Sequence, residues 1–136
     1  MRKSALGAAL VVLIAGCGSS GGNAGSAGGR VVVGDSDNGR TVTLSRGDTL
    51  ELQLHSTYWR VERVSAGVLA ASRPTVAAGS PSMTRCVPGQ GCGTVTVDFR
   101  AAHAGRATVR AHRTSCGEAR RCTGGAGAFR LTVVVK

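Results

Sequence analysis

The chain has 136 residues with 17 Lys or Arg and 7 Asp or Glu, so its formal net charge is +10. One Trp, one Tyr and two Phe are too few to build a surface that stacks on single-stranded nucleic acid. The arginines are scattered, so we expect a solvated charged surface and no nucleic-acid partner, with attraction to anionic envelope polymers as the alternative.

The first 16 residues have the features of a bacterial lipoprotein signal in the right order. A basic start, Arg2 and Lys3, precedes an apolar run over 5–14 that is too short to span a bilayer. The run "IAGC" then resembles the lipobox, at which a signal is cleaved before a lipid-modified cysteine. This resemblance implies a signal peptide over 1–16 and a lipid on Cys17. The protein would then be exported and anchored to the outer face of the bacterial cytoplasmic membrane; an ordinary secretory signal is the alternative.

A Gly/Ser/Ala segment follows Cys17. The run "GSSGGNAGSAGG" cannot bury apolar surface, and we interpret 17–29 as the lipidated cysteine and a disordered, flexible linker. Residues 30–136 remain, which is enough for one small domain with one core.

Alternation of apolar and polar residues runs through most of that domain. It is clearest in "TLELQLH" (49–55), "TVTVDFRA" (94–101), "RATVRAHR" (106–113) and "AFRLTVVVK" (128–136), as half-buried strands require. Three shorter candidates are "RVVVG", "TVTLS" and "YWRVERV", while "AGVLAAS" (66–72) fits a strand or one helical turn. The pattern predicts an all-β fold, an immunoglobulin-like, two-sheet antiparallel sandwich of about seven strands. Long polar loops are expected at 72–93 and 114–127.

Four cysteines fall in the two predicted loops. Cys86 and Cys92 are separated by five residues, and so are Cys116 and Cys122. Export favours disulfides, and the spacing favours these two local pairs; cross-pairing between the loops is the alternative. Zinc ligands usually lie two to four residues apart, redox motifs read Cys-x-x-Cys, and a blue-copper site would need a His or Met after the cysteine. We therefore expect no metal and no cofactor.

Nothing in the sequence indicates catalysis. The histidines, at 55, 103 and 112, lie on polar strand faces or in a turn, and no nucleophile elbow or paired-carboxylate motif occurs. We expect a protein that is not an enzyme.

Two stretches resemble a known family of inhibitors. "GTVTVDFRAAHAGRATVRA" (93–111) resembles the central segment of chagasin-type inhibitors of papain-like cysteine peptidases, and "SRGDTLELQLHST-YW" (45–59) resembles the strand leading into their first binding loop. The resemblance implies an immunoglobulin-like sandwich whose three loops at one end fill a peptidase cleft.

The three loops keep parts of the family motifs. Thr57 matches a Thr of Asn-Pro-Thr-Thr-Gly, "GQGCG" (89–93) resembles Gly-x-Gly-Gly with Cys92 inserted, and Arg113 matches the Arg of Arg-Pro-Trp. The Asn, Pro and Gly of the first motif are absent, as are the Pro and Trp of the third. The candidate partner-binding residues are Ser56, Thr57, Tyr58, Gly89, Gln90, Gly91, Gly93, Arg113 and Glu118.

Three functions follow as hypotheses. The first is a non-enzymatic, chagasin-like inhibitor whose partner is a cysteine peptidase. The second is a structural or ligand-binding surface lipoprotein, monomeric like the first, that uses the same scaffold to bind another envelope protein; the third is a metal carrier. The glycines of 89–93 serve either close backbone approach to a cleft or turn geometry, and Trp59 is expected in the core. Convergence of loops 55–59, 89–93 and 113–118 at one end of the domain would favour inhibition.

Overall fold

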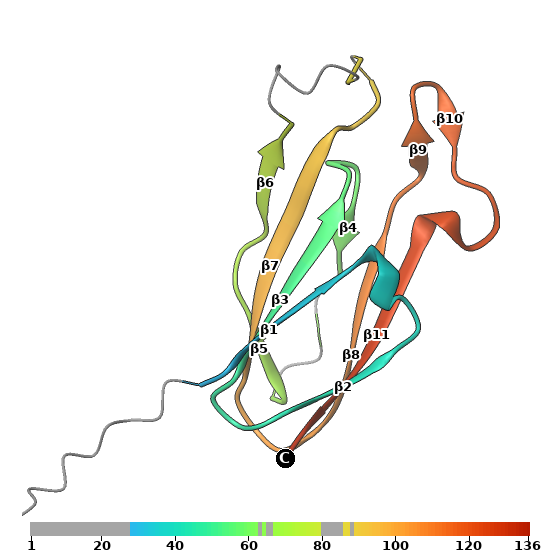
Figure 1. Cartoon of the computed structure of the whole chain (residues 1–136). Coiled ribbons are helices and arrows are strands. Elements are labelled where there is room, and N and C mark those ends of the chain that lie inside the picture. Colours follow the sequence, from blue (N-terminus) through green and yellow to red (C-terminus); the bar gives the residue numbers. More distant parts are fainter. Residues whose placement is uncertain (1–27, 63, 65–66, 80–85, 88) are drawn as a thin grey trace, which may run out of the picture.

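A computed structural model of the chain describes residues 28–62, 64, 67–79, 86–87 and 89–136 (Figure 1). The predicted signal peptide, Cys17 and most of the predicted linker lie outside these residues. Besides strands, the described part contains two short 3-10 helices, η1 (Asp35–Asp37) and η2 (Gly124–Gly127). Neither has the length and hydrophobicity that a bilayer-spanning helix needs.

The strands form two sheets and one small hairpin (Figure 1). The first sheet has the order β1–β3–β7–β5, and β6 pairs with the same edge of β7 as β5 does. Its strands are β1 (Arg30–Gly34), β3 (Thr49–His55), β5 (Leu69–Ala71), β6 (Thr75–Ala78) and β7 (Gly93–Ala101). The second sheet has the order β2–β11–β8–β4, with β2 (Thr41–Leu44), β4 (Arg60–Val61), β8 (Gly105–His112) and β11 (Ala128–Val135). The hairpin pairs β9 (Ser115–Gly117) with β10 (Arg120–Arg121).

The core lies between the two sheets and follows the predicted alternation. Leu50, Leu52 and Leu54 of β3 are fully buried, whereas the residues between them are partly exposed. The same alternation places inward the following side chains of β7, β8 and β11: Val95, Val97, Phe99, Ala101, Ala107, Val109, Ala111, Phe129, Leu131, Val133 and Val135. No polar or charged side chain is buried in the described part of the chain. The sandwich prediction is confirmed.

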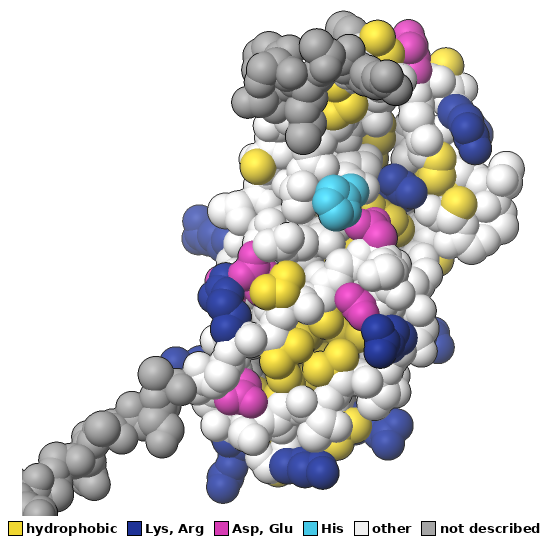
Figure 2. Space-filling model, in the orientation of Figure 1, with side chains coloured by type: hydrophobic (Ala, Val, Ile, Leu, Met, Phe, Trp, Pro, Cys, Tyr) yellow, Lys and Arg dark blue, Asp and Glu magenta, His cyan; other side chains and the backbone are white. Residues whose placement is uncertain are grey.

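Two strand pairs are parallel, whereas the sequence predicted a wholly antiparallel sandwich. β1 pairs with β3, and β2 pairs with β11, each in parallel register. A parallel pair needs a crossover connection between its strands. Here β1 leads through η1 into β2 of the opposite sheet before the chain returns to β3, so β2 supplies that crossover. On the side of the sandwich where the chain crosses from β1 to β2, hydrophobic side chains reach the surface between these two strands (Figure 2).

The predicted loops contain additional short strands. The described residues form eleven strands against about seven expected, and three of them, β6, β9 and β10, lie within 72–93 or 114–127. All four residues of β6 are exposed, so this strand has no alternating burial that a sequence pattern could reveal. The predicted strand over 58–64 is reduced to β4, and "AGVLAAS" supplies the strand β5.

Candidate functional site

Three loops meet at the end of the sandwich opposite the C-terminus (Figure 1). The first follows β3, the second precedes β7 and the third follows β8. We call the described residues 56–59, 89–92 and 113–122 the loop edge. Backbone hydrogen bonds join the first two loops: the Ser56 amide donates to the Gly93 carbonyl and the Thr57 amide to the Gly91 carbonyl, both at 2.8 Å.

Ser56 turns the chain sharply as it leaves β3. Its φ of 119° lies in a region that residues other than glycine rarely occupy. The Ser56 amide is bound to Gly93, and the Ser56 Oγ accepts a hydrogen bond from the Tyr58 amide at 3.2 Å. The surrounding bonds thus hold a strained conformation at the start of the first loop.

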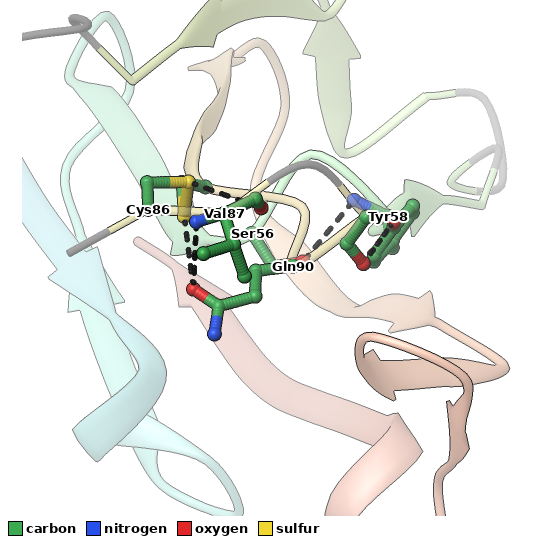
Figure 3. Close-up of a disulfide and its surroundings, with 7 residues drawn as sticks. Ser56, Tyr58, Cys86, Val87 and Gln90 are labelled. Atoms are coloured by element: carbon green, nitrogen blue, oxygen red, sulfur yellow. Dashed lines mark hydrogen bonds between the residues drawn. A yellow bond between two sulfur atoms is a disulfide. The ribbon is translucent and has the colours of Figure 1, made fainter.

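Tyr58 links the first loop to the tip of the second. Its hydroxyl donates a hydrogen bond of 2.6 Å to the Gly89 carbonyl (Figure 3). Its ring also packs against Gly91, where a Cβ would lie 2.4 Å from the ring atoms. Replacing Gly91 therefore requires Tyr58 to move.

Two of the three loop glycines have packing roles. Gly91 and Gly93 have φ of 68° and 136°, and a Cβ on Gly93 would lie 2.2 Å from the carbonyl oxygen of Ala77. These contacts favour turn and packing geometry for both residues. Gly89, with φ of 88°, is exposed at the tip, and a Cβ there would meet only the side chain of Glu118 at ordinary contact distance. Gly89 is thus the loop glycine whose backbone is open to solvent.

A disulfide between Cys86 and Cys92 closes the second loop (Figure 3). Within it, the Gln90 amide donates to the Val87 carbonyl at 3.1 Å, and the Val87 amide donates to the Gln90 Oε1 at 3.3 Å. The local pairing predicted from the sequence is confirmed here. It is confirmed again in the third loop, where Cys116 pairs with Cys122 across the β9–β10 hairpin.

Arg113 begins the third loop by covering Trp59. Its guanidinium lies 4.6 Å from the centroid of the Trp59 ring, and its Nε donates to the Ala126 carbonyl at 3.3 Å. Trp59 is 4% exposed and its Nε1 donates to the His55 carbonyl at 3.1 Å, so it belongs to the core as predicted. A cation–π contact of this kind fixes the first loop against the third.

The segment under Arg113 was not anticipated. Residues 124–127 form η2, and the Arg113 amide donates to the Gly127 carbonyl at 2.9 Å. A Cβ on Gly127 would lie 2.4 Å from the Arg113 carbonyl oxygen. The run "GGAG" (124–127) is the sequence feature that permits this close approach, but glycines alone do not show which residue lies against them. Beside it lies a shallow pocket of about 180 Å³ whose lining includes Asp35, Trp59 and Arg113.

All of the predicted partner-binding residues lie in or next to the loop edge. Ser56, Thr57 and Tyr58 are half-buried, and Gly89, Gln90 and Glu118 are exposed. Since Glu118 faces Gly89 and Arg113 covers Trp59, the third loop adjoins both of the others. The loops converge.

Each of the three histidines contacts a neighbouring oxygen through its Nδ1. The Nδ1 of His55 lies 2.7 Å from the Asp35 carboxylate, and that of His112 lies 3.5 Å from Glu62. The Nδ1 of His103 lies 2.5 Å from the Gly67 carbonyl oxygen. Among the described residues, no three His, Cys, Asp or Glu side chains are grouped to hold a metal ion.

One shifted carboxyl lies away from the loop edge. Hydrogen bonds from Gln53 and Arg30 hold the pKa of the Glu51 carboxyl below its ordinary value. Arg30 also pairs with Asp98 at 3.3 Å on the outer face of the first sheet. This network supports the sheet, not the loops.

Solved structures share the fold. The chain is similar to the cysteine protease inhibitor EhICP2 from Entamoeba histolytica, with 16% identity, a TM-score of 0.58, and coverage of 79% of this chain and 96% of that one. It is also similar to amebosin, with 16% identity, a TM-score of 0.56, and coverage of 80% and 100%. No protein-family model and no curated protein matches the sequence. At this identity the similarity establishes the sandwich fold.

Proposed function

We propose that the loop edge is a protein-binding surface that occupies the cleft of a papain-like cysteine peptidase. The observation that carries the proposal is the convergence of the three loops at one end, joined by the Tyr58–Gly89 bond and the Arg113–Trp59 contact. Two disulfides restrict the same loops. A surface ordered before binding loses less conformational entropy when it docks.

The proposed contact centres on the tip of the second loop. Gly89 and Gln90 are exposed between the half-buried Tyr58 and the exposed Glu118. With no side chain at Gly89, the partner can come close to the backbone there. The protein would block a peptidase by filling its cleft and would catalyse nothing itself.

Titration of papain with the purified protein tests this proposal. We expect competitive inhibition, and its absence at micromolar protein would contradict it. Glu118→Arg should raise the inhibition constant by roughly tenfold because it places a long charged side chain at the contact. The matched control, Glu62→Arg, makes the same charge change on the outer face of the second sheet and should leave inhibition unchanged.

A second candidate is a binding module for another envelope protein. It is favoured by the finding that the residues matching the inhibitor motifs are used within the domain: Gly91 and Gly93 pack against neighbouring loops, and Arg113 covers Trp59. Capture of an envelope protein that depends on residues 113–122, together with no effect on papain, would favour this candidate.

We also propose that the domain is exported and held at the membrane by lipid on Cys17. The support is the order of features in residues 1–17 and the oxidising environment that two disulfides need. Mass spectrometry of the mature protein should find an N-terminal, acylated Cys17. An intact N-terminus carrying no lipid would contradict the proposal.

A further inference from the structure

The outer face of the second sheet carries a stripe of arginines. Along β8, Arg106 and Arg110 point outward while Ala107, Val109 and Ala111 face the core. Arg130 of β11 and Arg60 of β4 are exposed on the same face, as the strand register shows. We call Arg60, Arg106, Arg110 and Arg130 the basic face.

Two of these arginines oppose each other directly. Arg110 and Arg130 are partners in the antiparallel register of β8 and β11, so their side chains leave the sheet side by side. Like charges at directly opposed positions destabilise a sheet. Among the described residues, none of the four arginines forms an ion pair. The only acidic side chain described on this face, Glu62, lies near His112.

The outer face of the first sheet carries charges of both signs. On its outer face Arg30 pairs with both Glu51 and Asp98. On the side of the molecule shown in Figure 2, acidic side chains also lie among the basic ones. Arg100 on the first sheet also forms no ion pair within the described part of the chain, but the outer face of that sheet carries charges of both signs, whereas the basic face has four arginines and one described carboxylate.

The basic face is long and polar. Arg106 and Arg110 are four positions apart, a distance of about 13 Å along a strand. Between them lies Thr108, which pairs with Thr132, and Thr132 in turn pairs with Thr41. Hydroxyl and guanidinium groups fit a charged surface that is contacted from outside, since few apolar side chains here could enter a hydrocarbon layer.

We propose that the basic face docks on the surface of an anionic phospholipid bilayer. Guanidinium groups bind phosphate oxygens with paired hydrogen bonds, and each basic residue near an anionic membrane raises the partition coefficient by roughly fivefold. A tether on Cys17 would hold the face close to such a surface, so that weak attraction suffices. The inference does not depend on the peptidase proposal. Arg60 borders the loop edge, since its guanidinium donates to the Thr57 and Trp59 carbonyls, so the test uses Arg110 and Arg130.

The test compares binding of the full chain to vesicles of phosphatidylcholine with and without about 30 mol % phosphatidylglycerol. The readout is the ratio of the two partition coefficients. Arg2 and Lys3 contribute equally to this ratio in the wild type and in the variants, so the change in the ratio isolates the substituted arginines. Arg110→Gln/Arg130→Gln should lower this ratio by roughly 25-fold, because each of the two arginines contributes about fivefold. The matched control, Arg73→Gln/Arg100→Gln, removes the same charge from the first sheet and should leave the ratio unchanged. Because the first variant relieves a like-charge pair, it should fold at least as well as the wild type.

Three results would overturn the inference. They are no preference of the wild type for anionic vesicles, equal loss in both variants, and binding to a soluble anionic polymer such as polyphosphate without binding to vesicles. Two results together would support it. The preference for anionic vesicles should fall only in the Arg110/Arg130 variant, and the preference of the wild type should disappear in 1 M salt, where the screening length falls to about 3 Å.

Discussion

The body of the sandwich and its loop edge are held together by different interactions. In the body, Leu52, Phe99 and Leu131 belong to an apolar layer in which no described polar side chain is buried. At the loop edge, order comes from disulfides, from backbone bonds between loops and from single contacts such as that of Tyr58 with Gly89. Stability should therefore depend mainly on the body, and partner binding mainly on the edge.

The largest effect is expected in the body. Phe99→Ala removes a fully buried ring from β7 and should lower the free energy of unfolding by about 3–5 kcal/mol. Urea denaturation followed by circular dichroism measures it. A loss below about 1 kcal/mol would show that the ring does not anchor the core, contrary to its burial.

Opening a disulfide at the loop edge should cost less stability but more binding. Cys116→Ser with Cys122→Ser frees the β9–β10 hairpin, and closing a loop this short contributes roughly 2 kcal/mol in the chain-entropy model. Thermal unfolding should show that moderate loss, while inhibition of papain or capture of a partner falls much further. Equal effects of this variant and of Phe99→Ala on binding, at matched stability, would contradict the division between body and edge.

A smaller effect should come from the contact between Tyr58 and Gly91. Gly91→Ala places a Cβ against the ring, in a loop where the residue already has φ of 68°. Gly39→Ala is the control, because Gly39 has φ of 83° but no neighbouring atom within 4 Å of the added Cβ. Both variants carry the backbone cost of the left-handed conformation, so their difference in unfolding free energy isolates the contact.

We expect Gly91→Ala to be about 1 kcal/mol less stable than Gly39→Ala. Nuclear magnetic resonance should also show the Tyr58 ring displaced in Gly91→Ala alone. Equal stability with an unmoved ring would mean that the first two loops are not packed through this contact.

The same division explains what the sequence could predict. Strict alternation predicts the burial of Leu50, Leu52 and Leu54, and the repeated five-residue spacing of an even number of domain cysteines predicts the two local disulfides. The Tyr58–Gly89 bond joins residues 31 positions apart and depends on the path of two loops, which no local pattern specifies. The opposition of Arg110 and Arg130 depends on strand register, and the exposed β6 has no alternation to detect.

The smallest effect concerns the pH dependence of the body. Because Gln53 and Arg30 lower the pKa of the Glu51 carboxyl in the folded state, folding favours its ionised form. That stabilisation is complete above the ordinary pKa of a glutamate and is lost as the pH falls through the lower, folded value. In Glu51→Gln the unfolding free energy should therefore decline less steeply between about pH 5 and 3 than in the wild type.

Glu118→Gln serves as the matched control, since it removes an exposed carboxylate for which the described residues contain no ion pair. It should keep the wild-type slope, and Glu51→Gln should keep wild-type partner binding. Chemical denaturation at several pH values gives the slopes. If Glu118→Gln flattened the acid limb and Glu51→Gln did not, the charges that stabilise this domain would lie at its loop edge, and the separation of stability from recognition would fail.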